Sequence, residues 1–294
     1  MVRKEKDMSD IKIIVDTAAD MPKELLEEYD IGIINFLSVF GETSYVAGED
    51  LSNAEFYKML KESGLHPTTA QTPYADMYDY LLEESKKHKT VIYFTISSKG
   101  SGQNHTAHMV VDEIKESDNP DADIHIFDTM SYSVYIGSAA VYAAKLIKEG
   151  FEADEIIEKC REYMDGFRAY LLVDDLKYLQ KGGRITKTAA IVGSLLDIKP
   201  VLTVNDGLIE PFEKLRGKKK VIKKLVQLIS ESSEFDSENK EFMIVHSDET
   251  LAEEALEALR DEFGDISVVM YAEFGPIVGT HTGNGCLGIV FRRK

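Results

Sequence analysis

The chain has 294 residues, of which 44% are hydrophobic and 29% are charged. This much apolar material supports a sizeable core, so the composition excludes a disordered chain, a collagen-like repeat and a disulfide-stapled miniprotein. The length indicates two domains or one large one. Because 52 acidic residues outweigh 34 lysines and arginines, the formal charge is −18. Such a chain repels nucleic acid and anionic lipid unless it carries a local basic patch.

Cysteine usage and hydropathy predict a cytoplasmic protein. Cys160 and Cys286 are the only cysteines, and neither has a second thiol or a metal-spaced histidine nearby. We therefore expect reduced thiols and no metal centre. The charged first residues run into an apolar stretch too short for a signal peptide, and no window approaches 18 apolar residues, so we expect no membrane span.

The first half of the chain alternates β-rich runs with amphipathic patterns, which is typical of βα units around a mainly parallel sheet. The capping box of Ser52 and Glu55 opens one predicted helix, and Pro73 stands at the favoured first position of the next. A glycine, Gly166, is the expected C′ residue of the last helix. Predicted strands cover residues 11–15, 31–36, 91–96 and 124–127, and predicted helices cover 52–62, 73–87, 101–115, 133–148 and 153–164.

The second half changes character. Asp206-Gly207 is a strong hairpin signal between two strands, so an antiparallel element joins the sheet. Predicted strands cover residues 169–173, 199–204, 208–213, 242–246, 266–271 and 287–291, and predicted helices cover 175–180, a piece that ends at 196, 218–230 and 249–263. We predict an α/β protein with an N-terminal α/β domain over residues 1–166 and a C-terminal α+β domain with a mixed sheet over 167–294.

Hydroxyl-rich loops follow the predicted strands of the first half, where open α/β sheets bind ligands. These loops contain Asp16 to Asp20, Thr68 to Thr72, Ser97 to Gly102 and Asp128-Thr129. Ser, Thr and Asp before a helix often cap it without doing chemistry, and this interpretation stays open for the aspartates. Ser101 is the stronger candidate, because it lies between glycines at a predicted helix N-terminus, which favours an anion.

Two further segments carry candidate residues. His281 lies in a glycine-rich stretch, so we expect it on a loop, where it can donate to a carboxylate or phosphate oxygen. Arg184 follows the Gly182-Gly183 break, and a basic run follows it. Such a run is either a solvated helix face or a patch that attracts an acidic partner, a phosphate or a membrane. The basic run comprises Lys214, Arg216, Lys218, Lys219, Lys220, Lys223 and Lys224.

The order and spacing of these segments resemble the DegV family, the bacterial fatty-acid-binding proteins that serve as the B subunit of fatty acid kinase. The resemblance covers nearly the whole chain. It is carried by Asp16-Thr17-Ala18-Ala19-Asp20, Thr69-Ala70-Gln71, Ser97-Ser98-Lys99-Gly100-Ser101-Gly102, Gly182-Gly183-Arg184-Ile185, Lys199-Pro200 and His281-Thr282-Gly283-Asn284-Gly285.

The resemblance implies a DegV-like fold that holds one long-chain fatty acid, such as palmitate, stearate or oleate, in a tunnel between its two domains. Thr69, Ser101 and His281 would bind the carboxylate. Arg184, Arg216 and Thr282 would support this site or face a partner. That partner would be an ATP-using fatty acid kinase subunit similar to dihydroxyacetone kinases, which phosphorylates the presented carboxylate for phospholipid synthesis. The chain itself would need no cofactor and catalyse nothing, and it could contact the membrane transiently.

Tail burial would dominate the affinity for such a ligand, since a sixteen-carbon chain gains roughly 12 kcal/mol gross at about 0.8 kcal/mol per methylene. The main alternative is a serine hydrolase with Ser101 as nucleophile, His281 as base and Asp16 or Asp128 as orienting group. The sequence lacks the Gly-x-Ser-x-Gly pattern for it, because Lys99 stands two residues before Ser101. A nucleotide-phosphate site would need a Walker or Rossmann glycine motif, and neither is present.

Overall fold

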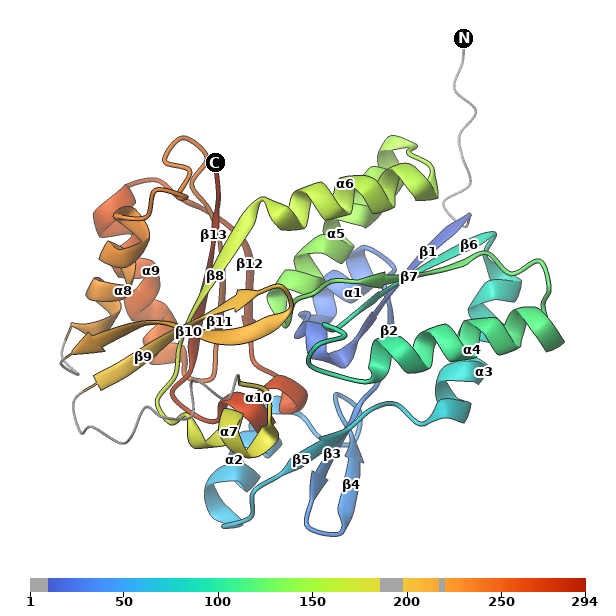
Figure 1. The fold of residues 1–294 in the computed structure, drawn as a ribbon, viewed down its shortest axis with the longest axis horizontal. Helices are drawn as coiled ribbons and strands as arrows, with labels where there is room; N and C mark the ends of the chain where they lie inside the picture. Colours follow the sequence, from blue (N-terminus) through green and yellow to red (C-terminus); the bar gives the residue numbers. More distant parts are fainter. Residues whose placement is uncertain (1–9, 186–197, 217–219) are drawn as a thin grey trace.

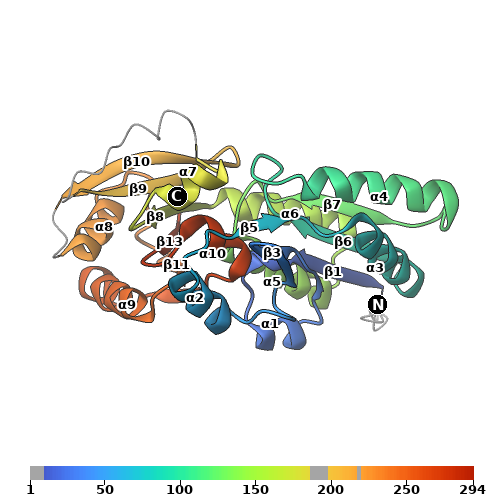
Figure 2. The same ribbon diagram turned by 90° about the horizontal axis from the view of Figure 1, so that it is seen from below.

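The structure is a computed structural model that describes residues 10–185, 198–216 and 220–294. Its strands form three sheets of four, six and three strands (Figure 1). Figure 2 shows the six-stranded sheet at one end of the molecule and the four-stranded sheet at the other. None of the helices in these described ranges is long and apolar enough to cross a membrane.

The four-stranded sheet has the order β2-β1-β6-β7 and is parallel throughout. One face packs against α3 and α4 through Ile14 and Tyr93, and the other packs against α5 through Val15 and Phe94. The near-continuous apolar runs of these strands follow from burial on both faces. The strands are β1 (Ile11–Asp16), β2 (Gly32–Ile34), β6 (Thr90–Thr95) and β7 (Ile124–Asp128), and the helices are α3 (Tyr74–Lys87), α4 (Gln103–Ser117) and α5 (Val134–Glu149).

The six-stranded sheet is mixed, with the order β10-β9-β8-β13-β11-β12 and one parallel pair, β11 with β12. Alternate residues of β8 point to opposite faces: Tyr170 packs on the α8 and α9 side, whereas Ala169 and Leu171 face α5. The elements are β8 (Phe167–Leu172), β9 (Ile198–Asn205), β10 (Leu208–Arg216), α8 (Val221–Ser230), β11 (Glu241–His246), α9 (Glu249–Phe263), β12 (Ser267–Glu273) and β13 (Leu287–Arg292).

A third sheet, of order β4-β3-β5, was not predicted from the sequence. Its strands are only three or four residues long, too short for a clear apolar repeat, and among them only β3 has buried residues, Ser38 and Phe40. The strands are β3 (Leu37–Phe40), β4 (Thr43–Val46) and β5 (Thr68–Ala70). The remaining elements are the 3-10 turn Thr17–Ala19, α1 (Lys23–Glu28), α2 (Asn53–Glu62), α6 (Ala153–Asp165), α7 (Lys177–Gly182) and α10 (Pro276–Thr282).

Most predicted elements are present, and the predicted α/β fold with a parallel first sheet and a mixed second sheet is confirmed. The capping box of α2 forms. The hairpin turn has positive φ at both Asp206 and Gly207, as its sequence requires. The helix predicted over 249–263 has these bounds in the structure, and the helical piece predicted to end at residue 196 lies outside the described residues.

Several helix ends differ from the prediction. Pro73 is the N-cap of α3 and so precedes the first helical residue, and Gly166 ends α6 with a φ of −74°, outside the left-handed region. The helix predicted from residue 175 begins at Lys177, because the Asp175 carboxylate accepts the Lys177 N–H. The basic helix begins at Val221, since the preceding residue is left-handed. The domain boundary at residue 166 stays a prediction.

Asp16 fixes the loop that follows β6. Its carboxyl accepts the backbone N–H of Ile96 at 2.8 Å and that of Ala18 at 3.1 Å, and the side chain is fully buried. Burial raises its pKa to about 7, although the two backbone hydrogen bonds lower it. This bridge between neighbouring parallel strands holds the start of the Ser97–Gly102 loop.

Replacing Asp16 with asparagine should destabilise the protein, because the amide nitrogen would face one of the two N–H donors. We expect a loss of about 1–3 kcal/mol in the free energy of unfolding. Chemical denaturation at pH 4 measures it, and Asp79→Asn on the exposed side of α3 is the matched control, with little expected effect.

The difference between Asp16→Asn and wild type should narrow as the pH rises from about 4 to about 7. The unfolded carboxyl ionises near its ordinary pKa of 3.8, whereas the folded one ionises near 7. Over this window the unfolded wild-type chain loses its proton first, so wild-type stability falls with pH while asparagine does not titrate. A difference that widens over the same range would contradict a protonated Asp16.

Candidate ligand-binding site

A pocket of about 860 Å³ lies between the α5 face of the six-stranded sheet and the C-terminal end of the first sheet. This volume includes space that is open to solvent. Its walls are mainly apolar. They include Ala169 and Leu171 of β8, Val204 of β9, Ile209 of β10, Val245 of β11, Gly288 and Val290 of β13, and Phe36, Ile96, Phe274, Ile277 and Val278.

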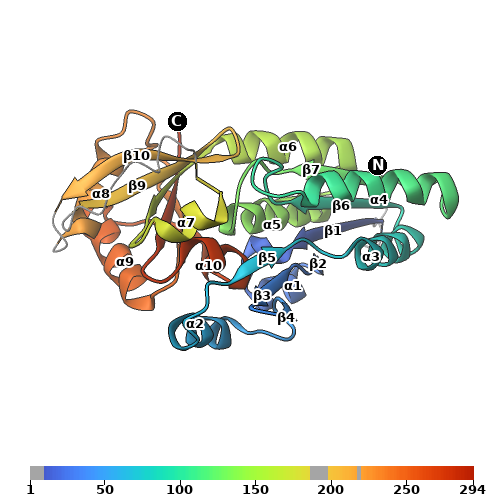
Figure 3. The ribbon, with the colours of Figure 1, turned by 60° about the horizontal axis from the view of Figure 1, so that its bottom comes forward.

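Thr69 and His281 meet at the polar end of this pocket. Their side chains form a hydrogen bond of 3.0 Å between Oγ1 of Thr69 and Nε2 of His281. Both residues were expected on loops, and this expectation is wrong. Thr69 lies in β5, opposite Ser38 of β3, and His281 lies in α10, which packs between β5 and α7 (Figure 3). Pro276 at the start of α10 explains how so glycine-rich a segment forms a helix.

The imidazole of His281 is neutral at physiological pH. Burial, together with smaller effects of the charges of Arg184 and His66, lowers its pKa to about 4. Nδ1 is buried and has no hydrogen-bond partner among the described residues. The ring lies against Gly182, where a Cβ would overlap Nδ1, so any other residue at that position would displace the imidazole. The Gly-Gly turn after α7 therefore places the histidine.

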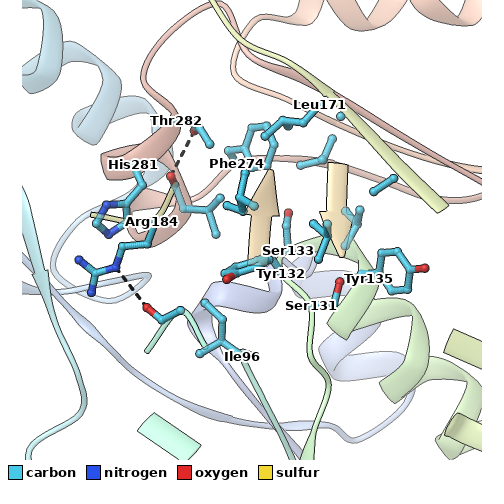
Figure 4. Close-up of a pocket in the computed structure, with 18 of the residues that line it drawn as sticks. Ile96, Ser131, Tyr132, Ser133, Tyr135, Leu171, Arg184, Phe274, His281 and Thr282 are labelled. Atoms are coloured by element: carbon cyan, nitrogen blue, oxygen red, sulfur yellow. Dashed lines mark hydrogen bonds between the residues drawn. The ribbon is translucent and has the colours of Figure 1, made fainter. Parts of the chain in front are cut away.

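Ser101 and Arg184 line the same end of the pocket. Ser101 lies two residues before α4, and its hydroxyl accepts the N–H of Gln103 at 3.2 Å while its own hydrogen stays available. The Arg184 guanidinium donates from Nε to the carbonyl of Gly100 at 3.1 Å and from Nη1 to that of Gly182. Arg184 thus joins the serine loop to the turn that supports His281. Figure 4 shows Arg184 beside His281.

Of the other two candidate residues, Thr282 lies at the pocket and Arg216 lies away from it. Thr282 lines the pocket, but its hydroxyl donates to the carbonyl of Val278 at 3.1 Å. Arg216 does not line the pocket. It is exposed at the end of β10 that is remote from the Asp206-Gly207 turn. That turn approaches the site, because the carbonyl of Gly207 accepts the hydroxyls of Ser97 and Tyr132, each at 2.8 Å.

Sequence reasoning missed the segment from Ser131 to Tyr135, all five residues of which line the pocket. This segment follows Asp128-Thr129 at the carboxyl end of β7, so the rule that pointed to the other loops could have found it. Ser133 has a φ of 58°, unusual for a residue with a side chain. Its hydroxyl donates to the buried carboxyl of Asp20 at 2.5 Å.

The residues needed for a serine hydrolase are not assembled. The Asp128 carboxylate accepts the backbone N–H groups of Ser98 and Met130, and Asp16 is committed to backbone groups as described. In the described part of the chain no carboxylate bonds the His281 ring, and its Nε2 meets Thr69 rather than Ser101. Within the same residues, no three His, Cys, Asp or Glu side chains are placed to hold a metal ion.

An apolar pocket that ends in a hydroxyl, an imidazole and a guanidinium has a polarity that matches an amphiphilic anion. Residues 10–294 match the family model described as "Uncharacterised protein, DegV family". The chain belongs to the DegV family, as its sequence predicts.

Relatives of known sequence or structure match along nearly their full length. A DegV domain-containing protein of Clostridium perfringens is 35% identical over 97% of this chain and 98% of its own. The crystal structure of DegV from Bacillus subtilis, described as a fatty acid binding protein, superposes with a TM-score of 0.83 at 32% identity, covering 97% and 100% of the chains. A stearic acid-binding protein from Eubacterium ventriosum gives a TM-score of 0.86 at 25% identity, covering 96% and 98%.

Removing the charge of Arg184 should raise the pKa of His281, because this cation opposes protonation of the ring. In Arg184→Gln we expect a pKa between about 4 and the ordinary 6.5, since burial remains the larger effect. Titration of the ring C2–H signals by NMR measures it. Lys177→Gln removes a charge outside the pocket and serves as the control. A His281 pKa that stays unchanged in Arg184→Gln would show that burial alone sets it.

Proposed function

We propose that this protein binds one long-chain fatty acid, with the carboxylate at Thr69, Ser101 and His281 and the acyl chain in the apolar pocket. The observation that carries the proposal is the distribution of polar and charged groups along that pocket. The hydroxyls of Tyr132, Ser133 and Tyr135 also line it, yet each donates to a protein acceptor. Arg184 and His281 supply the guanidinium and the imidazole of the lining, and they lie together at one end, so a ligand with one anionic head fits in one direction.

The electrostatics of that end suit a carboxylate. An isolated carboxylate loses several kcal/mol of hydration in an apolar site unless donors replace the water. Arg184 keeps its charge at all physiological pH values, and hydrogen bonds to a charged group are worth about 1.5–3 kcal/mol each. A neutral His281 still offers one N–H. The fatty acids named for the B. subtilis and E. ventriosum relatives support the same ligand class.

The pocket draws on both predicted domains. The four-stranded sheet lies entirely before residue 166, the six-stranded sheet lies entirely after it, and segments from each line the pocket. This supports the division into residues 1–166 and 167–294 with the lipid between them.

The protein expressed in bacteria should co-purify with fatty acid, and delipidated protein should take up palmitate or oleate. Thr69→Val keeps the shape of the side chain but removes its hydroxyl. We expect binding about 10- to 100-fold weaker, the equivalent of one hydrogen bond to a charged group. Extraction with mass spectrometry identifies the ligand, and titration calorimetry measures the affinity.

The neighbouring Thr68→Val is the matched control, because Thr68 is exposed and does not line the pocket. The proposal fails if the wild-type protein neither carries nor takes up fatty acid. Equal affinities of Thr69→Val and wild type would remove Thr69 from the head-group site while leaving the lipid pocket intact.

We further propose that the bound carboxylate is presented in the cytoplasm to a separate ATP-dependent kinase subunit, which forms the acyl-phosphate and carries the catalysis. The resemblance to fatty acid kinase B subunits motivates this step. The exposed basic residues of β10 and α8 support an acidic partner surface, because they stand out on a chain of charge −18. A transient contact with an anionic membrane would use the same charges. These residues are Lys214, Arg216, Lys220, Lys223 and Lys224.

Reversing Lys214 and Arg216 together to glutamate should slow acyl-phosphate formation at least severalfold, because like charges would then face the kinase. Both side chains lie outside the pocket, so fatty acid affinity should stay at the wild-type value. The rate is measured with the kinase of the source bacterium and labelled ATP. Reversing Lys86 of α3 and Lys115 of α4 together to glutamate is the control, because it makes the same change in net charge at exposed positions. An unchanged rate in the double variant would refute docking at this surface.

A further inference from the structure

The far end of the pocket is closed by two aromatic rings. Along β8, Leu171 and Ala169 face the pocket, and the next residue on the same face is Phe167. Phe167 does not line the pocket and is only 3% exposed. On the neighbouring strand, Arg292 pairs with Phe167, and its guanidinium lies 4.9 Å from the Phe167 ring centre. Phe167 is therefore held from behind.

Tyr135 completes this end wall. It lies in the first turn of α5, lines the pocket, and meets the Phe167 ring edge to face at a centroid distance of 6.2 Å. Its hydroxyl donates to the carbonyl of Met164 in α6 at 3.1 Å. Figure 4 shows Tyr135 at the opposite end of the lining residues from His281 and Arg184. The hydrogen bond fixes the ring, so this end of the pocket has a definite depth.

We propose that Tyr135, backed by Phe167, sets the longest acyl chain that the protein accepts. This inference rests on the proposed function, because a chain whose carboxylate is held at His281 must end before Tyr135. Small side chains give the acyl chain its room along the way, since Ala169 and Gly288 line the sheet wall. Each methylene accommodated beyond the present wall should improve binding about fourfold.

Side chains also pack against Phe167. Tyr163 packs on the far side of Phe167 at 5.1 Å, and a separate pocket lined by Ser138, Tyr142 and Tyr163 opens beyond it. A shorter side chain at residue 135 would thus extend the apolar space toward other side chains. A larger side chain at residue 169 should shorten the space for the acyl chain, because the methionine of Ala169→Met would fill the pocket just in front of Phe167.

The experiment offers delipidated full-length protein an equimolar mixture of saturated fatty acids from twelve to twenty-two carbons and quantifies the bound acids by mass spectrometry. Wild type should show a sharp upper limit of length. In Tyr135→Leu we expect this limit to move up by two or more carbons, with at least a tenfold gain for the first acid that wild type rejects. Tyr135→Phe keeps the ring and should keep the wild-type profile.

Two further variants keep the test decisive if Tyr135→Leu does not fold. Phe167→Leu should also raise the limit, and Ala169→Met should lower it by two or more carbons. If the variants that fold bind the same range of chain lengths as wild type, the assignment of Tyr135 and Phe167 as the end wall is overturned. The proposal that the protein binds fatty acid would still stand in that case. Wild-type protein that retains none of the acids would overturn the proposed function instead, and the length limit with it.

Discussion

The hydrogen bond between Thr69 and His281 joins two segments that are 212 residues apart in the chain. Neither residue could reach the other without the small sheet that carries β5 and the short helix α10 that packs on it. The requirement behind this contact is general, because an anionic head at the end of an apolar pocket needs several donors at one point. Here the donors come from both halves of the chain, and their meeting depends on how the halves pack.

Asp20 reinforces that packing from behind the site. Its carboxyl accepts the Ser133 hydroxyl and, at 2.8 Å, the backbone N–H of Gly275, which caps the helix that carries His281. Tyr57 adds a second tie by donating to the carbonyl of Phe274 at 2.9 Å. Burial raises the pKa of Asp20 to about 7. A protonated carboxyl still has an oxygen that accepts the Gly275 N–H, so the hydrogen bond to α10 does not require a charged Asp20. The first half of the chain thereby holds the start of α10 in place.

Much of the fold follows from local sequence signals. The apolar runs of β1 and β6, the capping box at Ser52 and the Asp206-Gly207 turn each specify their structure within a few residues, and they fold as predicted. The third sheet has no such signal, and α10 has only Pro276 at its start, because short strands and a glycine-rich segment acquire their structure mainly from packing. Thr69 and His281, which were singled out by residue type, both line the pocket, yet their backbone setting was predicted wrongly for this reason.

The sequence by itself determined the α/β class, the order of the main elements, the family, and the loops that carry polar side chains at strand ends. These are properties of neighbouring residues and of their spacing. The tertiary structure decided which candidates share a site: it unites Thr69, Ser101, Arg184 and His281 around one pocket and leaves Arg216 on the surface. It also decided the depth of that pocket, since Tyr135 and Phe167 meet only when α5 packs on the second sheet. Contacts between distant segments leave no periodic pattern in the chain that forms them.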